Sequence, residues 1–276
     1  MSGPCCPSSR SEYRRLFGRK LAGHEARRYR RKGLSKTARE LVAAAGTGSV
    51  LDVGGGVGTI ALELVERGAS RATVVELSDG YEQAARELFA EHDLRDRVER
   101  SIGDIVTEAD LVEPHDIVVL HRVVCCYPDA DALVSAAARY ARASLLLTYP
   151  RIRLVNRLCF GAINLWLWLT RCSFRTFVHP FATIAAAAER EGLELTAREP
   201  QGLFWENAAF VRLPEGCGGN SGGMEPRHRE SETEQIASER AADATEESRE
   251  RRGEDDIRIE DDDTRHDAEP DEEVQI

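Results

Sequence analysis

From residue 49 onward, short apolar runs alternate with longer segments whose apolar residues recur every three to four positions. The short runs predict strands at residues 49–53, 71–77, 98–102, 115–120 and 144–149, and the periodic segments predict helices at 57–67, 80–92 and 130–143. This alternation is typical of an α/β protein with a parallel sheet, in which right-handed crossovers give a doubly wound order with helices on both faces. Ligands of such folds bind at the carboxyl ends of the strands.

The first strand runs into a glycine-rich turn, and the turn runs into a helix. Residues 50–60 have the sequence VLDVGGGVGTI, with glycines at Gly54, Gly55, Gly56 and Gly58. Alternate glycines let the backbone turn sharply and let a ligand approach it closely, while Asp52 offers a carboxylate at the strand end. Glu76 ends the second strand, where α/β nucleotide folds place the acid that holds two ribose hydroxyls. These positions predict a cofactor-binding corner.

The spacing of the glycines separates two classes of cofactor. A dinucleotide fingerprint G-x-G-x-x-G that begins at Gly54 requires glycine at position 59, where the chain has Thr59. An acid two residues before G-x-G-x-G instead resembles the first motif of class I S-adenosylmethionine-dependent methyltransferases. The resemblance implies that the loop wraps the methionine part of S-adenosyl-L-methionine, and that Glu76, with its neighbour Leu77, binds the ribose. An NAD(P)-dependent Rossmann oxidoreductase remains the alternative.

Two further positions match the family. After the third strand come Gly103, Asp104 and Ile105, and the resemblance implies that Asp104 binds the adenine amino group with the other two beside it. A plain turn role for Asp104 is the alternative. His121 follows the fourth strand. The resemblance implies that the carboxyl end of this strand faces the transferred methyl group, so His121 is also expected at the cofactor.

The expected catalytic residues are His121, Tyr127 and His179, the titratable groups that strand ends or an inserted segment could bring to the methyl. A general base is needed only where the acceptor has to lose a proton, as a hydroxyl or phenol does. For each histidine, a hydrogen-bonding role in the wall of the site is the alternative.

The resemblance spans residues 35–213. It implies a Rossmann-like, doubly wound, mostly parallel seven-stranded sheet, closed by a helix at 181–191 and strands at 193–199 and 204–212. Residues 1–34 are expected to form a basic N-terminal helical segment, whose helices cover the cofactor in methyltransferases of this type. The insertion at 151–180 is predicted to be a substrate lid. Its apolar stretch, residues 154–169, also suits a core helix or weak contact with a membrane surface.

Charge marks off the end of the chain. Residues 214–276 contain 22 Asp and Glu against 8 Arg, and this segment has no aromatic residue. Such a composition cannot bury enough apolar surface to offset chain entropy, so we expect a disordered acidic C-terminal tail.

Basic residues and cysteines add little to this assignment. The arginine-rich run at residues 27–32 has no recognised nucleic-acid motif beside it, so it predicts a solvated helix face and no nucleic-acid partner. Seven cysteines occur without a C-x-x-C pair, and no metal site is predicted. Arginines interrupt the amino terminus before any apolar leader could form, which favours a cytoplasmic protein.

Together these features predict a methyltransferase that acts on a small, apolar organic acceptor. A non-catalytic cofactor-binding protein of the same fold is the remaining alternative. The sequence gives no prediction of the acceptor atom or of the oligomeric state.

Overall fold

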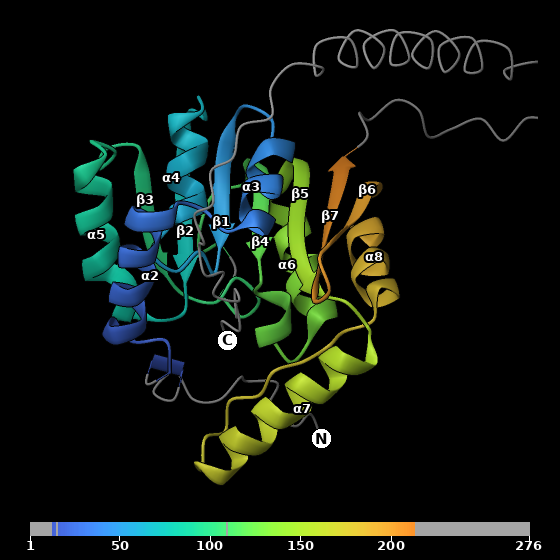
Figure 1. The fold of residues 1–276 in the computed structure, drawn as a ribbon. Helices are drawn as coiled ribbons and strands as arrows, with labels where there is room; N and C mark the ends of the chain where they lie inside the picture. Colours follow the sequence, from blue (N-terminus) through green and yellow to red (C-terminus); the bar gives the residue numbers. More distant parts are fainter. Residues whose placement is uncertain (1–12, 15, 109, 213–276) are drawn as a thin grey trace, which may run out of the picture. The chain divides into compact units, whose positions relative to one another are not determined.

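The computed structural model describes residues 13–14, 16–108 and 110–212, and these contain a seven-stranded sheet of order β3-β2-β1-β4-β5-β7-β6 (Figure 1). The strands are β1 (Ser49–Val53), β2 (Arg71–Glu76), β3 (Val98–Ile102), β4 (His115–His121), β5 (Ala141–Pro150), β6 (Leu193–Gln201) and β7 (Trp205–Arg212). β1 to β5 are parallel, and β7 is antiparallel to both β5 and β6. The predicted doubly wound, mostly parallel sheet is confirmed. The acidic tail predicted at 214–276 lies outside the described residues.

Helices cover both faces of the sheet and enclose two apolar cores. One face carries α2 (Arg19–Lys32), α3 (Lys36–Ala44), α4 (Thr59–Glu66) and α5 (Glu82–Glu91), and the other carries α6 (Ala130–Tyr140) and α8 (Phe181–Arg190). β1 is buried along its whole length, with Val50 in the first core and Leu51 in the second. Successive side chains of β1 point to opposite faces of the sheet, and helices cover both faces. The end of β1 therefore lies deep in the protein.

Polar residues begin two of the helices. The Ser35 hydroxyl accepts a hydrogen bond from the Ala38 backbone N–H at 3.3 Å, and an Asp129 carboxyl oxygen accepts one from Ala132 at 3.0 Å. Each side chain satisfies one of the backbone donors that a helix leaves free in its first turn.

The helix predicted at residues 130–143 is wrong at its end. It stops at Tyr140, and β5 begins directly at Ala141. The Arg212 guanidinium from β7 donates hydrogen bonds to the carbonyls of Ala138 at 2.9 Å and of Ala141 at 3.0 Å. An arginine 74 residues further along the chain than Ala138 thus caps the helix, and no glycine marks the end in the sequence.

The predicted insertion at 151–180 contains one further helix, α7 (Leu154–Leu169), followed by an extended stretch up to α8. Figure 1 shows α7 outside the two helical layers that cover the sheet. No helix within the described ranges has the length and apolar character needed to cross a membrane.

The strand order reverses between β1 and β4, which lead away in opposite directions along the sheet. At such a switch point the loops that follow the two strands separate and leave a crevice at the carboxyl ends of the strands. The glycine-rich turn after β1 and residues 121–127 after β4 lie at this edge.

Candidate cofactor site

The turn after β1 is built from backbone conformations that favour glycine. Gly54 and Gly56 have φ angles of +65° and +56°. A Cβ atom on Gly54 would lie 2.7 Å from a Val123 methyl group, and one on Gly56 would lie 2.9 Å from a carboxyl oxygen of Glu25. The turn therefore requires glycine for its conformation and for the close approach of neighbouring groups.

Glu76, at the end of β2, reaches this turn. Its carboxylate accepts hydrogen bonds from the backbone N–H groups of Gly56 at 3.1 Å, Leu77 at 2.8 Å and Ser78 at 3.2 Å. Burial raises the pKa of Glu76, while these N–H groups and Arg100 oppose the rise. The structure thus holds the predicted ribose-binding carboxylate against the glycine turn.

Asp52 is buried beside the same turn. Neither of its carboxyl oxygens makes a hydrogen bond of normal geometry to a described residue, although the Ala61 backbone amide is close enough to lower its pKa. Burial is the largest effect and raises the pKa of Asp52 from 3.8 to about 7. A buried carboxyl group without partners has lost its hydration and gained little in return, so it favours a cationic or donating ligand.

A third carboxyl group comes from α2, which the sequence places outside the methyltransferase domain. Glu25 lies against Gly56, and burial followed by the charge of Glu76 raises its pKa from 4.5 to about 8. Asp52 adds to this rise. Three carboxyl groups therefore converge on one turn.

One buried cation faces the three acids. Arg100, on β3, donates from Nη2 to the Gly56 carbonyl at 3.0 Å and from Nε to a carboxyl oxygen of Glu82 at 2.7 Å. Its Nη1 is buried without a partner among the residues that the structure describes. Arg100 lowers the pKa of each of the three acids, but it also pairs with Glu82, so a single cation is shared by four carboxyl groups.

The residues predicted at the adenine end are also brought together. Asp104 is buried, and its carboxylate accepts hydrogen bonds from the Val106 backbone at 2.9 Å and from the Tyr127 hydroxyl at 3.1 Å. Gly103 is hydrogen-bonded through its N–H to the Glu76 carbonyl at 3.1 Å, and Ile105 is buried next to them. The hydrogen bond from the Val106 backbone N–H to Asp104 is typical of a turn. The hydrogen bond from Tyr127 goes further, because it connects the end of β3 to the segment after β4.

The three predicted catalytic residues have different surroundings. Tyr127 is buried and donates its hydroxyl proton to Asp104, and His179 donates from Nε2 to the Tyr127 carbonyl at 2.9 Å. His121 ends β4, with its Nε2 2.9 Å from the Thr37 hydroxyl. Burial, then Arg122 and Arg28, lower the pKa of His121 to about 3, so its ring is neutral at physiological pH. Arg28 thus brings an arginine of the N-terminal segment close to the site.

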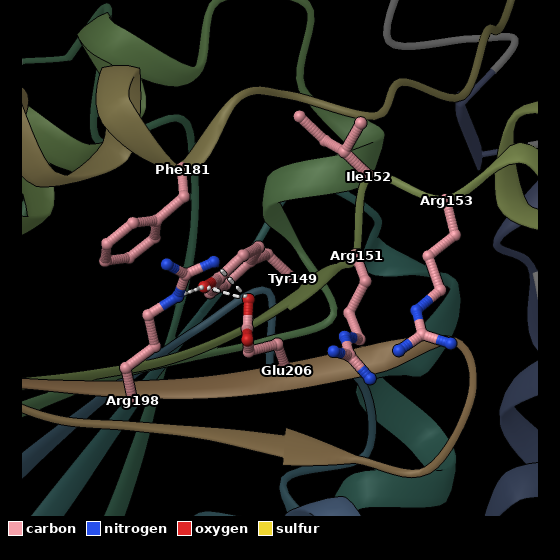
Figure 2. A pocket seen from close by; sticks show the side chains of 7 residues that line it. All are labelled: Tyr149, Arg151, Ile152, Arg153, Phe181, Arg198 and Glu206. Atoms are coloured by element: carbon pink, nitrogen blue, oxygen red, sulfur yellow. Dashed lines mark hydrogen bonds and ion pairs between the residues drawn. The ribbon is translucent and has the colours of Figure 1, made fainter.

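A small cavity of about 170 Å³ opens at the carboxyl end of β5 (Figure 2). Its lining combines three arginines with one acid and three apolar or aromatic residues: Arg151, Arg153, Arg198, Glu206, Tyr149, Phe181 and Ile152. Figure 2 shows the Tyr149 hydroxyl between Arg198 and Glu206, donating to Glu206 at 2.6 Å and accepting from Arg198 at 3.0 Å. The cavity is smaller than sites that hold a whole drug-sized ligand, so it has room for only part of one.

Comparison with known proteins agrees with this geometry. Residues 50–144, from β1 to the start of β5, match the family described as "Methyltransferase domain". This segment is therefore similar to methyltransferase domains. The match confirms the predicted resemblance to class I S-adenosylmethionine-dependent methyltransferases, on which the expected cofactor rests. Among curated proteins, none matches the sequence.

Solved structures show the same fold at low sequence identity. Magnesium protoporphyrin IX methyltransferase from Synechocystis PCC 6803, solved with bound SAH, is 17% identical, with a TM-score of 0.52 over 74% of this chain and 93% of that chain. An O-methyltransferase family protein from Burkholderia thailandensis is 19% identical, with a TM-score of 0.55 over 70% and 58% of the two chains. Human N-acetylserotonin methyltransferase in complex with SAM is 16% identical, with a TM-score of 0.53 over 74% and 57%.

Two residues at the glycine turn are missing from the sequence prediction: Glu25 and Arg100. Glu25 is the only acid in α2 and lies between Ala22 and Ala26, the buried residues of that helix, so it had a detectable signal. Arg100 had none, since a charged residue in a short strand commonly faces solvent. Among the described residues, no group of three His, Cys, Asp or Glu side chains is arranged to hold a metal ion.

Proposed function

We propose that this protein is an S-adenosylmethionine-dependent methyltransferase that acts on a small organic acceptor. The observation that carries the proposal is the convergence of Glu25, Asp52 and Glu76 on the glycine turn, with Asp52 unpartnered among the described residues. A buried excess of carboxyl groups favours a ligand with positive charge. S-adenosylmethionine has a positive sulfur and an ammonium group, and so fits this requirement.

The same charge argues against a nicotinamide dinucleotide. In dinucleotide-binding folds the pyrophosphate lies on the glycine turn and the helix that follows it. Here Glu25 lies against Gly56, at the centre of that turn. A phosphate in this place would meet carboxyl groups whose pKa values are raised chiefly by burial, with the charge of Glu76 adding to the rise.

The residues of the site would divide the work of binding. Glu76 would accept hydrogen bonds from the ribose hydroxyls, and Asp104 would accept one from the adenine amino group, with Leu77 and Ile105 beside it. The bare glycine turn would leave room for the methionine part, with Asp52 and Glu25 on its cationic side. When bound, the cofactor supplies a methyl group activated by a positive sulfur. The protein then has to hold the acceptor in line and exclude water.

We base the proposed class of acceptor on the solved structures that share the fold at low sequence identity. The neighbours named above are methyltransferases of magnesium protoporphyrin IX and N-acetylserotonin, which are small ring molecules. The cavity beside β5 would receive one arm of such an acceptor, with Tyr149 and Phe181 as its aromatic residues and Arg151 and Arg153 also in its lining. His121 and Tyr127 stay the proposed groups for handling an acceptor proton, although in this state His121 is a weak base and Tyr127 is bonded to Asp104.

A thermal-shift series tests the class of cofactor directly. The purified full chain is heated with S-adenosylmethionine, S-adenosylhomocysteine, NAD and NADP in separate samples. We expect both sulfur nucleosides to raise the melting temperature and neither dinucleotide to change it, because only a ligand bound to the folded state stabilises it. Stabilisation by a dinucleotide alone would overturn the proposal.

Turnover separates an enzyme from a binding protein of the same fold. The chain is incubated with S-adenosylmethionine and a panel of aromatic acceptors that carry hydroxyl, carboxyl or amino groups, and S-adenosylhomocysteine is measured by mass spectrometry. We expect acceptor-dependent formation of S-adenosylhomocysteine for at least one group. Binding of the cofactor with no turnover across the panel would favour the non-catalytic alternative.

A further inference from the structure

The exposed apolar side chains of this protein are concentrated on one segment. Of the eleven large apolar residues that are exposed in the described structure, seven lie between positions 152 and 169: Ile152, Leu154, Leu158, Leu165, Trp166, Trp168 and Leu169. Leu154 is 74% exposed, and Trp168 and Leu169 are 63% and 65% exposed. Single exposed apolar residues need no explanation, but a contiguous group marks an interaction surface.

These residues share one face of α7. Leu154, Leu158, Leu165 and Trp168 follow one another at intervals of three, four or seven residues, which places them in a row along the helix, with Leu169 beside them. Trp166 borders the row. We call these exposed residues, together with Ile152, the outer face of α7.

The opposite face of α7 is anchored to the protein. Leu167 is buried in a small cluster with Cys172 and Phe174, and Asn156 is fully buried. The Asn156 amide donates to the Arg151 and Phe204 carbonyls, both at 2.8 Å, and Asn164 bonds to the backbone of Thr176 in both directions. The outer face is therefore the exposed side of a docked helix, since its inner side already has partners.

Charge around the outer face has one sign. Residues 151–188 contain five arginines and no aspartate or glutamate. Arg153, Arg157 and Arg171 are exposed along the helix and at its two ends, and their guanidinium groups make no hydrogen bond or ion pair with any described residue. This combination of an apolar row, interfacial tryptophans and unpaired arginines matches the requirements of a helix that lies in the plane of an anionic membrane surface.

We propose that the outer face of α7 docks on an anionic lipid bilayer, with its leucines and tryptophans in the interface and its arginines on the lipid phosphates. The helix has 16 residues, which corresponds to roughly 24 Å at about 1.5 Å per residue, short of the roughly 30 Å of a hydrocarbon core, so it lies on the surface. This surface does not depend on the cofactor or on methyl transfer.

Vesicle sedimentation tests the proposal. The full chain is mixed with vesicles of phosphatidylcholine alone or of phosphatidylcholine with phosphatidylglycerol, and the bound fraction is measured at low and high salt. We expect binding to the anionic vesicles that weakens with salt, and little binding to phosphatidylcholine alone. Trp166 and Trp168 are two of the three tryptophans of the chain, so a blue shift of the fluorescence should accompany binding.

Two sets of variants connect binding to α7. Leu158→Glu combined with Leu165→Glu should abolish sedimentation with vesicles, whereas Leu195→Glu, an exposed leucine on β6, should leave it unchanged. Arg157→Gln combined with Arg171→Gln should weaken binding to anionic vesicles roughly thirtyfold at low salt. Melting temperatures should stay near that of the wild type in all variants, since the substituted side chains are exposed.

Three outcomes would overturn the proposal. The first is no sedimentation with anionic vesicles, and the second is sedimentation that the two leucine substitutions leave intact. The third is a dimer in sedimentation velocity that those substitutions dissociate, in a protein that does not bind vesicles, which would assign the outer face to a second copy of the chain.

Discussion

Around the glycine turn, three carboxyl groups and an arginine are buried, whereas along α7 leucine and tryptophan side chains face solvent. Both regions depart from the ordinary distribution of side chains, in which charges are exposed and large apolar groups are covered. The departures are opposite in kind. Buried acids demand a ligand that brings charge or hydrogen-bond donors, and an exposed apolar row demands a partner that brings apolar surface.

The two regions also differ in how they are held. The cofactor corner is assembled from parts far apart in the chain, because α2, β1, β2 and β3 each supply one group, and the groups constrain one another through hydrogen bonds and repulsion. α7 is a single local segment whose inner face is anchored and whose outer face is unconstrained. Substitutions in the first region should therefore affect ligand affinity and stability together, and substitutions of Leu158 or Leu165 on the outer face of α7 should affect neither.

The largest expected effect comes from Gly56→Val. A valine at φ +56° is strained, and its Cβ would lie 2.9 Å from Glu25. We expect binding of S-adenosylhomocysteine, measured by calorimetry, to weaken by roughly a hundredfold or more, equivalent to about 3 kcal/mol. Gly46→Val is the matched control, since a Cβ there meets nothing within 4 Å. Near-normal binding by Gly56→Val would show that the turn does not hold the cofactor.

Glu76→Ala is expected to have the next largest effect. In the proposed ribose role, Glu76 supplies a charge-assisted hydrogen bond worth about 1.5 to 3 kcal/mol, so its removal should lower the affinity for S-adenosylhomocysteine roughly ten- to a hundredfold. The substitution also leaves the Gly56, Leu77 and Ser78 N–H groups without an acceptor, which should lower the melting temperature. Glu87→Gln, on the exposed side of α5, should change neither quantity. Unchanged affinity in Glu76→Ala would exclude the ribose role.

How much of this site could be predicted from sequence depends on how local each signal is. Asp52, the glycines and Glu76 lie at the ends of two successive strands, and their spacing alone shows that they meet. Asp104 follows the next strand and is predictable for the same reason. Glu25 contacts Gly56 from a helix that precedes the whole sheet, and Arg212 caps α6 from the last strand. Such contacts depend on how the layers pack, which spacing along the chain does not encode.

The α7 segment shows the complementary limit. Its apolar stretch is plain in the sequence, but a lid, a core helix and a surface helix have the same composition. Only the structure separates the inner side, with Asn156 and Leu167 buried, from the exposed row that contains Leu158 and Leu165. The sequence predicts an apolar helix with a few polar residues. Which of its sides is covered depends on how the helix packs against the rest of the protein.

Glu25→Gln sharpens the comparison, because it removes a carboxyl group that a cationic ligand would ionise, with little change of shape. We expect the affinity for S-adenosylmethionine to fall roughly fivefold, equivalent to about 1 kcal/mol, and the affinity for S-adenosylhomocysteine to change less, because the latter lacks the positive sulfur. Calorimetry with both ligands measures the difference. Arg27→Gln, on the exposed side of the same helix, is the control. Equal losses for the two ligands would contradict a role in recognising charge.

The pH dependence follows from the same carboxyl groups. The pKa of Glu25 is about 8 and that of Asp52 about 7 in the ligand-free protein, and a cationic ligand favours their ionised forms, so binding releases protons. Affinity for S-adenosylmethionine should therefore rise from pH 6 to pH 8 and then level off. The folded-state pKa of Glu25 lies above its ordinary value of 4.5, so its contribution to stability is present at low pH and lost as pH rises through about 8. Glu25→Gln should flatten both profiles at their alkaline end.

Tyr127→Phe has the smallest expected effect and separates positioning from catalysis. It removes the hydrogen bond to Asp104 and leaves the ring in place, so cofactor affinity should fall roughly two- to fivefold, within the usual 0.5 to 1.5 kcal/mol of a single hydrogen bond. If Tyr127 only positions Asp104, kcat measured with saturating cofactor should stay within about twofold of the wild type. A loss of 10²-fold or more in kcat would instead assign it the proton transfer of a general acid or base. Because Tyr127 follows β4 and is bonded to Asp104 after β3, this one substitution shows whether the network of buried polar groups ends at the proposed cofactor binding or extends into the reaction.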